Sequence, residues 1–375
     1  MVVLFFAMVG LVFPVDRIAS SVFAELPGRP PERLSKGAKN FWTGEWADNA
    51  HRVLRNESSV TRRSVGPYNE LVFRLTGRLQ PAVRLGRDKW LSPAERPREI
   101  PPLRVSSLIR ENVRLILRID KILEAHRARL VVGLVPDRSR IYPDRAYLSG
   151  KMPPQKRVFL PRLTRALTDA GIIAVDLTEA LRKERASGTK VFFSDDHHWT
   201  YRGAAASARP LADAWTPEWH EGRRMQFSVR WTGSRPSKGS LLRILGFRRG
   251  SAAEAAFRDR AAVAELGKGS RRDAFCAAYW STSFGQFHSG EFYASAVGCP
   301  VDIVRRSGQG SSCGPRLGLP AILRRRERDS EIVVVWEIPE YHMVNRTAAP
   351  PAYISATDKA LVELGLSEGR TGDGL

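Results

Sequence analysis

Two acids and two histidines stand side by side in the segment Val191 to Thr200, which reads VFFSDDHHWT. An aspartate shortly before a histidine on a loop can hold the imidazole in one tautomer, and the imidazole can then take a proton from a hydroxyl. Asp196 and His198 have a suitable spacing, and Asp195 lies one residue further from the same histidine. The segment therefore predicts one half of a proton-transfer site.

The same residues raise the alternative of a metal site. Neighbouring side chains on a strand point in opposite directions, so two acids and two histidines in a row do not readily converge on one ion. A zinc site would need further ligands, for which His288 and His342 are the candidates. We therefore predict neither a metal nor another cofactor, and an ordinary polar loop remains the third interpretation.

Two other turns that follow apolar segments carry groups for the missing half of the site. One holds Ser281, Thr282 and Ser283, and the other holds Gly308 and Gly310. A serine becomes a nucleophile when a base takes its proton, and a glycine turn leaves backbone N–H groups free to hold an oxyanion. Composition alone leaves a Ser-His-Asp triad as one possibility among several.

The elements that must position these turns alternate between amphipathic helices and apolar strands. Helical spacing of apolar residues, or continuous apolar runs, predicts helices over 106–129, 161–172 and 178–188 and buried strands over 130–135, 172–177 and 331–340. This alternation predicts an α/β fold with a parallel sheet flanked by helices, whose loops carry chemistry at the carboxyl edge.

Two further segments give local predictions outside this alternation. Residues 81–92 predict a strand, a glycine-containing turn and a second strand. The pattern from Thr216 to Arg272 is weak, but SAAEAAFRDRAAVAEL, residues 251–266, predicts a helix.

The first 15 residues, MVVLFFAMVGLVFPV, carry no charge. We interpret them as an export signal or a short uncleaved membrane anchor, with a buried helix as the alternative. The predicted organisation is a signal or anchor with the start of a linker over 1–24, a helical and linker region over 25–79, the α/β domain over 80–345 and a tail over 346–375.

The net charge of +21 would attract nucleic acid, anionic lipid or an acidic polymer. No nucleic-acid-binding motif accompanies the scattered arginines, so we predict no nucleic-acid partner. The three cysteines lack the spacing of a zinc knuckle. If the chain is exported, Cys299 and Cys313 could form a disulfide.

The segment FFSDDHHWTYRGA resembles the D-x-H-W-T-x-x-G-A motif of the alginate O-acetyltransferase family, whose catalytic domain is SGNH-hydrolase-like. Four other groups of segments resemble the family's remaining motifs in the same order between about residues 80 and 340: VRLGRDKWLS, VVGLVPDRSRIYPD, STSFGQF, and DIVRRSGQG with VVVWEIPE. The resemblance implies an SGNH-hydrolase-like parallel sheet flanked by helices.

Carried over to this chain, the resemblance makes Ser283 the nucleophile, His198 the general base and Asp196 the acid that orients it. The backbone N–H of Ser283 and the turn at Gly308 to Gly310 would donate to the oxyanion. The neighbours expected to shape the pocket are His197, Trp199 and Tyr201, with a core aromatic as the alternative for Trp199. Asp195 is expected to cap or support the loop.

Four positions depart from the family's pattern. Ser281 and Lys89 stand where glycine is usual, Tyr341 where an arginine commonly follows W-E-x-P-E, and Asp302 where a binding asparagine is expected. The serine could crowd the turn that carries the nucleophile. Ser281, together with the strand AFCAAYW before Ser283, which is poorer in Val, Ile and Leu than expected, keeps an inactive protein among the alternatives.

The expected function is acetyl transfer to hydroxyls of an exported, acidic, alginate-like polysaccharide through an acyl-enzyme. The resemblance also implies a membrane acyltransferase as the source of acetyl groups and a periplasmic location, anchored to the inner membrane by the N-terminal segment. The alternatives are an acetylesterase with the same triad and an inactive polysaccharide-binding subunit of an export complex.

Overall fold

The computed structural model describes residues 59–94, 99–215, 229–266, 275–306, 310–324, 332–344 and 351–366. The chain divides into two compact units, one of Met1–Gln80 with Leu245–Ala256 and one of Pro81–Ile244 with Phe257–Leu375. The apolar N-terminal segment and Gly308 lie outside the described residues. Within the described ranges, no helix has the length and apolar character needed to cross a bilayer.

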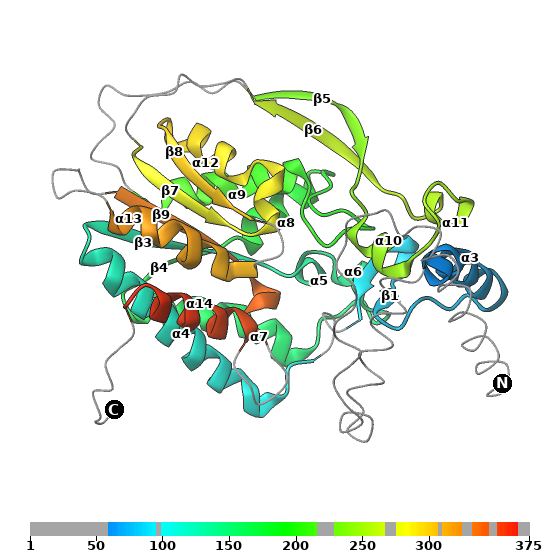
Figure 1. Cartoon of the computed structure of the whole chain (residues 1–375), viewed down its shortest axis with the longest axis horizontal. Helices are drawn as coiled ribbons and strands as arrows, with labels where there is room; N and C mark the ends of the chain where they lie inside the picture. Colours follow the sequence, from blue (N-terminus) through cyan, green and yellow to red (C-terminus); the bar gives the residue numbers. More distant parts are fainter. Residues whose placement is uncertain are drawn as a thin grey trace, which may run out of the picture. The chain divides into compact units, whose positions relative to one another are not determined.

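A five-stranded parallel sheet forms the centre of the larger unit (Figure 1). Its order is β4 (Ile173–Asp176), β3 (Ala128–Val135), β9 (Ile332–Pro339), β7 (Ala277–Ser281) and β8 (Val301–Arg305). Every neighbouring pair is parallel. Strands that are covered on both faces need apolar residues throughout, which explains the continuous runs in β3 and β9. The predicted fold class is confirmed.

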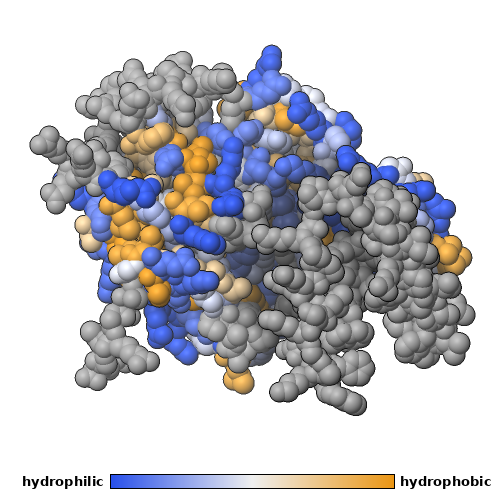
Figure 2. Space-filling model, viewed as in Figure 1, coloured by the Kyte–Doolittle hydropathy of each residue, from blue (hydrophilic) through white to orange (hydrophobic). Residues whose placement is uncertain are grey.

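Helices cover both faces of this sheet and bury two apolar clusters. One cluster includes residues of α4 (Pro102–Glu124), α7 (Pro154–Asp169), α13 (Leu319–Leu323) and α14 (Ala352–Glu363). The other includes residues of α8 (Thr178–Ala186), α9 (Tyr201–Asp213) and α12 (Ser289–Val297). On the face in Figure 2, hydrophilic residues cover much of the described surface, and hydrophobic residues gather on the side of α13 and α14.

Shorter elements complete this unit. They are the predicted antiparallel pair β1 (Val83–Leu85) and β2 (Leu91–Pro93), and the helices α5 (Arg138–Ile141), α6 (Pro143–Ala146) and α10 (Ser240–Leu245). The last helix ends at Leu245, where the smaller unit begins. The described helices of the smaller unit are α3 (Ser59–Thr76) and α11 (Ala252–Ala255).

The helix predicted over residues 251–266 is wrong for most of its length. Only α11 is helical, and residues 260–266 form β6 (Arg260–Leu266), which pairs antiparallel with β5 (Val229–Pro236). The alanine-rich sequence has a high helix propensity, but the backbone partner supplied by β5 decides the conformation.

The disulfide considered from the sequence is also wrong. Cys276 pairs with Cys299, and Cys313 is a free, buried thiol. The two bonded cysteines precede the neighbouring strands β7 and β8, where the Cys276 amide also donates to Pro300 O at 3.0 Å. The disulfide therefore closes a loop that contains Ser283 and α12.

A buried glutamate in β9 gives the sheet a pH dependence. Burial raises the pKa of Glu337 from 4.5 to about 7, although the hydrogen bond from the Tyr279 hydroxyl acts in the opposite direction. The folded protein then binds this proton more tightly than the unfolded chain, so stability falls as the pH rises from 4.5 to about 7.

Glu337→Gln should remove this loss. Thermal melts at several pH values should show the variant gaining about 3 kcal/mol relative to wild type between the acidic and alkaline ends of that range. Parallel melting curves for the two proteins would contradict this prediction.

Candidate active site

The acid-histidine segment forms a closed loop beside the sheet. An antiparallel bridge joins Phe192 to Trp199, and the Thr200 amide donates to Val191 O at 2.9 Å. Thr200 then caps α9, since its side chain accepts from the Gly203 amide at 3.2 Å. Strand-like pairing on one side and a helix start on the other therefore fix the ends of the loop.

The structure brings three of the sequence-predicted residues into one hydrogen-bonded chain. His198 Nε2 lies 2.7 Å from Ser283 Oγ, and His198 Nδ1 lies 2.6 Å from Asp196 Oδ1. Asp196 and His198 are buried, whereas Ser283 is half-buried. A base within this distance of a hydroxyl can take its proton, and an acid on the other ring nitrogen fixes the tautomer.

The Asp196 carboxylate accepts hydrogen bonds on both oxygens. Oδ1 receives the His198 backbone amide at 3.1 Å and Ser240 Oγ at 2.7 Å, and Oδ2 receives the Ser240 amide at 2.9 Å. Burial alone would raise the pKa of Asp196, but the bonds and positive charge from the histidines outweigh it and lower the pKa below its ordinary value. The acid is therefore held as a carboxylate.

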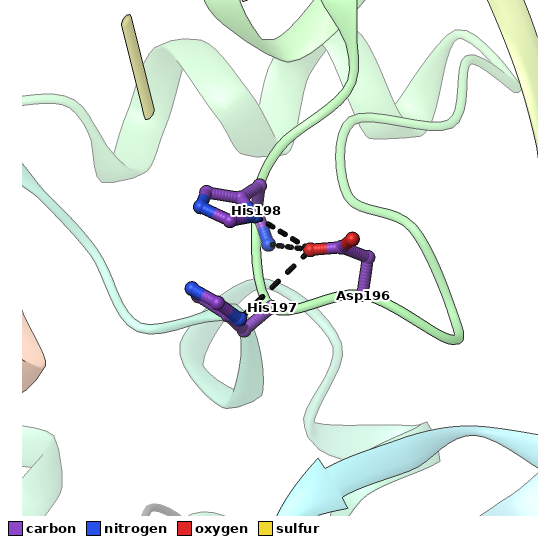
Figure 3. Close-up of side chains that lie close together, drawn as sticks. All are labelled: Asp196, His197 and His198. Atoms are coloured by element: carbon purple, nitrogen blue, oxygen red, sulfur yellow. Dashed lines mark hydrogen bonds and ion pairs between the residues drawn. The ribbon is translucent and has the colours of Figure 1, made fainter. Parts of the chain in front are cut away.

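Ser240 also contacts the second histidine. His197 donates its backbone amide to Ser240 Oγ at 3.1 Å, and its Nδ1 lies 2.6 Å from the same oxygen. Because the serine proton points to Asp196, the tautomer with hydrogen on His197 Nδ1 satisfies this contact. Figure 3 shows both imidazole rings beside the carboxylate, and their centroids are 3.8 Å apart.

Ser240→Ala should therefore lower activity through Asp196. The carboxylate loses one of its hydrogen-bond donors, and we expect kcat to fall by about tenfold, the equivalent of a hydrogen bond to a charged group. A less solvated carboxylate also favours the imidazolium, so the acid limb of the pH–rate profile should move to higher pH. Ser240→Thr keeps the hydroxyl, so its kcat and the acid limb of its pH–rate profile should stay close to those of wild type. An unchanged profile in Ser240→Ala would contradict the assignment.

Arg138 holds the acid-histidine loop to the end of β3. Its guanidinium donates to Asp196 O at 2.7 Å and to Phe193 O at 2.6 Å, and it stacks 4.1 Å from the centre of the Trp90 ring. The Leu91 amide donates to Ser194 O at 2.9 Å. The segments around residues 90 and 138 therefore support the backbone of this loop.

A buried ion pair fixes the segment that carries Arg138. Arg140 Nη2 lies 2.6 Å from Glu340 Oε1, its Nε donates to Oε2 at 3.0 Å, and the Asp137 amide donates to Oε2 at 2.8 Å. The glutamate follows β9, and the arginine follows the neighbouring strand β3. This pair therefore joins the carboxyl ends of two strands beneath the site.

Asp195 supports the loop from its other side. Its Oδ2 accepts from the Asp259 amide at 3.1 Å and from the Ser237 hydroxyl, and its backbone oxygen accepts from Leu241 N at 3.2 Å. Burial raises its pKa above the ordinary value despite these bonds. The geometry therefore gives Asp195 a role in anchoring the loop.

Ser283 begins a 3-10 turn, Ser283–Phe287, one residue after the end of β7. Thr282 caps it by accepting from the Phe284 amide at 3.2 Å. The Ser283 amide, at the first residue of this turn, is among those that a helix start leaves without an intrahelical acceptor. Trp199 is buried and donates its indole N–H to Phe284 O at 3.0 Å, so it is a core aromatic that ties the two halves of the site together.

The serine at position 281 is accommodated by a glycine four residues later. A Cβ at Gly285 would overlap Ser281 Oγ and Cβ, and would also touch Arg305 Cβ at 3.4 Å. Glycine at position 285 therefore leaves room for the Ser281 side chain, and the turn that carries Ser283 keeps its contact with His198.

Gly285→Ala should displace this turn. The overlap with Ser281 predicts a loss of about 1–3 kcal/mol in the free energy of unfolding, with a fall in kcat because Ser283 moves. Ser281→Gly in the same protein should recover most of both losses, since it removes the overlapping atoms. Chemical denaturation and steady-state rates of both variants and of Ser281→Gly alone make the comparison. If the losses of the two single variants simply added in the double variant, the packing of Ser281 against Gly285 would be refuted.

Two tyrosines, the expected neighbour Tyr201 and Tyr341 of the departures, lie against aromatic residues next to the triad. Tyr201, the first residue of α9, lies 5.3 Å from Phe287 and from His288 between ring centres. Tyr341 lies 6.4 Å from His197 and 6.2 Å from the Phe284 ring. Of the expected oxyanion turn, the backbone at Gly310 begins a 3-10 turn, Gly310–Ser312, and Gly308 is not among the described residues.

The acid-histidine segment also places possible metal ligands together. One ligand atom each from Asp196, His197 and His198 falls within a 4.8 Å span. Both ring nitrogens of His198 are engaged by Asp196 and Ser283, so a cation on that ring would break the hydrogen-bonded chain. The donor set therefore fits proton transfer better than metal binding.

Sequence reasoning missed Ser240, Arg138 and Glu340 as supports of the site. Ser240 is 44 residues from Asp196, in a stretch without a clear pattern. Arg138 and Glu340 lie inside segments that resemble family motifs, and charged residues at the ends of apolar strands were a usable signal for them.

A serine, a histidine and an aspartate that are joined by hydrogen bonds form the arrangement that serine acyl-enzyme chemistry requires. The family model of the SGNH hydrolase-like domain of acetyltransferase AlgX matches residues 83–340. The chain belongs to this family, and the resemblance drawn from its motifs is confirmed.

Individual relatives agree with the family. The chain is 29% identical over 204 residues to a Pseudomonas putida protein named "Probable alginate O-acetylase AlgJ", covering 54% of this chain and 52% of the relative. The corresponding Azotobacter vinelandii protein is 32% identical over 192 residues, covering 48% of each. The chain spans about half the length of these curated relatives.

Two solved structures share the fold. The O-acetyltransferase domain of Pseudomonas putida AlgJ superimposes with a TM-score of 0.56 at 24% identity, covering 74% of this chain and 99% of that domain. Pseudomonas aeruginosa AlgX gives a TM-score of 0.52 at 18% identity, covering 78% of this chain and 68% of that chain.

Proposed function

We propose that this chain is an exported O-acetyltransferase that acetylates hydroxyls of an acidic polysaccharide through Ser283. The observation that carries the proposal is the hydrogen-bonded chain from Ser283 through His198 to Asp196, inside a domain of the acetyltransferase family. Relatives named as alginate O-acetylases support acetyl transfer as the reaction and an alginate-like polymer as the acceptor.

The reaction runs in two halves. His198 Nε2 takes the Ser283 proton as Oγ attacks the carbonyl carbon of an acetyl donor, and the proton then passes to the leaving group as its bond breaks. A sugar hydroxyl next gives its proton to His198 as its oxygen attacks the acetyl-serine, and the same proton returns to Ser283 Oγ. Asp196 holds the Nδ1 proton throughout.

The oxyanion of each tetrahedral intermediate needs fixed donors. The Ser283 amide is one candidate, because the start of the 3-10 turn leaves it available. The segment from Gly308 to Gly310, which comes after β8 in the chain, is the second proposed source of donors. His197 and Tyr201 are proposed to shape the acceptor pocket.

Cations beside the nucleophile support an acidic acceptor. Lys238 Nζ donates to Gln286 Oε1 at 2.6 Å, and Arg305 Nη1 donates to Gly285 O at 3.0 Å, so both bind the turn that begins at Ser283. Glu291 pairs with Arg305 at 2.7 Å and leaves Lys238 as a positive charge there. A carboxylated sugar would be attracted to this turn.

The disulfide supports export, because such bonds persist in oxidising compartments. We propose a periplasmic location, with the apolar N-terminal segment as an inner-membrane anchor. A membrane acyltransferase that supplies acetyl groups is the proposed partner.

A transfer assay tests the function. Purified protein should move acetyl groups from an activated acetyl ester to an acidic oligosaccharide, and Ser283→Ala should lose this activity. Released acetate, measured in the same reactions, separates transfer from hydrolysis. Acetate release without any acetylated sugar would replace the proposal by an acetylesterase, and equal transfer by Ser283→Ala would refute it.

A further inference from the structure

Helix α3 turns polar side chains inward. Asn69 and Glu70 are buried, and they bond to backbone groups at the end of α10 and just after it. Asn69 Nδ2 donates to Leu245 O at 2.8 Å, and the Arg248 amide donates to Glu70 Oε1 at 2.7 Å. Gln80 Nε2 also donates to Asn69 Oδ1 at 2.7 Å. These contacts within the smaller unit fix which face of α3 is buried.

The opposite face of α3 is apolar. Tyr68, Leu71 and Leu75 are 65%, 55% and 75% exposed, and their spacing of three and four residues places them on one side of the helix. A helix on the surface of a soluble domain usually presents polar residues there. In α3 this exposed face carries apolar side chains instead, so it fits an apolar environment.

The exposed charge of the same unit is positive. Among its side chains that the structure describes, the exposed charged residues are Arg74, Arg78, Arg248 and Arg249. The two acids, Glu70 and Glu254, are buried and accept from the backbone amides of Arg248 and Gly250. The described part of the unit therefore combines an apolar stripe with exposed charged side chains that are all arginines.

We propose that this face of α3, defined by Tyr68, Leu71, Leu75 and Arg74, lies on an anionic phospholipid bilayer, together with Arg78 just beyond the end of the helix. Leucine and tyrosine side chains enter the boundary between headgroups and acyl chains, and the two arginines bind lipid phosphates beside them. An acidic polysaccharide would match the arginines but offers no aliphatic phase for the two leucines. The uncharged run of residues 1–15 precedes α3 on the same chain, consistent with a nearby bilayer. This contact is independent of the acetyl-transfer proposal.

A fluorophore at residue 75 tests the contact in the full chain. Because Cys276 and Cys299 are bonded and Cys313 is buried, Leu75→Cys supplies the accessible thiol among the described residues for an environment-sensitive dye. Arg165→Cys is the matched control, since Arg165 lies on α7 of the other unit with an 84% exposed side chain. Both labelled proteins are mixed with phosphatidylcholine vesicles, with and without phosphatidylglycerol.

The dye at residue 75 should shift to the blue with anionic vesicles and be quenched by lipids that carry a nitroxide on the acyl chain. The dye at residue 165 should not change. Arg74→Glu should weaken vesicle binding at this site by at least about fivefold, the effect of one basic residue near an anionic surface. Because the dye reports only on its own position, binding through another segment does not imitate this result.

Four results would overturn the proposal. They are vesicle binding without a change at residue 75, an equal shift with neutral vesicles, a shift that grows with protein concentration in the absence of lipid, and a shift caused by acidic polysaccharide alone. The third would assign the face to a second copy of the chain, and the fourth to the polymer.

Discussion

An Asp196→Asn variant should keep its fold and lose about four orders of magnitude in kcat, the effect expected when a triad acid no longer holds its histidine in the working tautomer. The carboxylate receives donors on both oxygens, from His198 and Ser240 at Oδ1 and from the Ser240 amide at Oδ2. In either orientation of the new side-chain amide, its NH₂ group faces one of these donors. The imidazole must then change its proton arrangement or turn away from Ser283.

The neighbouring acid supplies the matched control for this variant. Asp195→Asn changes an equally buried carboxyl that contacts Ser237 and Asp259 and makes no described hydrogen bond to His198. It should lower thermal stability and retain most of its kcat. The measurement is kcat and KM for an activated acetyl ester, with circular dichroism melts on both proteins. An Asp196→Asn enzyme within tenfold of wild type would show that this acid does not orient the base.

Glu340→Gln should have the largest effect on stability, a loss of about 3–5 kcal/mol in the free energy of unfolding. The change leaves the Arg140 guanidinium buried, with a side chain only 4% exposed, and without its charged partner. Burial would lower the pKa of Arg140, but Glu340 reverses this effect and raises it, so the arginine stays charged in the wild-type pair. A buried and uncompensated charge is among the most destabilising single changes.

Two controls separate the loss of the pair from the loss of contacts in general. Asp169→Asn breaks the exposed pair with Arg165, whose side chains are 84% and 68% exposed, and should change stability by less than about 1 kcal/mol. Arg140→Met combined with Glu340→Gln removes both charges and should recover part of the loss. Urea denaturation of the three variants provides the comparison. A Glu340→Gln loss no larger than that of Asp169→Asn would contradict the role given to this pair.

The central sheet could be predicted because its strands are continuous apolar runs between amphipathic helices. A parallel strand that is buried on both faces has no other suitable composition, so β3 and β9 are recognisable without knowledge of their partners. Residues 260–266 could not be assigned in this way. Their alanines suit a helix, and only the presence of β5 makes them a strand.

The three residues of the hydrogen-bonded chain could be named from the sequence, but most of the residues that support them could not. Asp196 and His198 are neighbours in the chain, and Ser283 follows an apolar strand, so local sequence carries the information. The position of Ser240 beside Asp196 depends on how residues 229–266 return to the loop, which no local pattern encodes. The disulfide could not be assigned from the sequence either. The positions of three cysteines in the chain do not show which two of them precede neighbouring strands.

The departures from the family pattern illustrate the same limit. Ser281 was expected to crowd the turn that carries Ser283, yet the structure places its side chain in the space left by Gly285. A substitution judged by its own position gives the wrong expectation when a second residue accommodates it. The inactive alternative therefore loses one of the observations that favoured it.

The most direct test of the account is to identify the residue that carries the acetyl group. The purified protein is mixed with an activated acetyl ester, quenched in acid within one turnover and digested for mass spectrometry. The account predicts acetyl on the peptide that contains Ser283, its disappearance when an acidic oligosaccharide is added, and its absence in Ser283→Ala. Acetylated oligosaccharide formed at the wild-type rate by Ser283→Ala, or acetyl carried through turnover on another residue, would contradict the account.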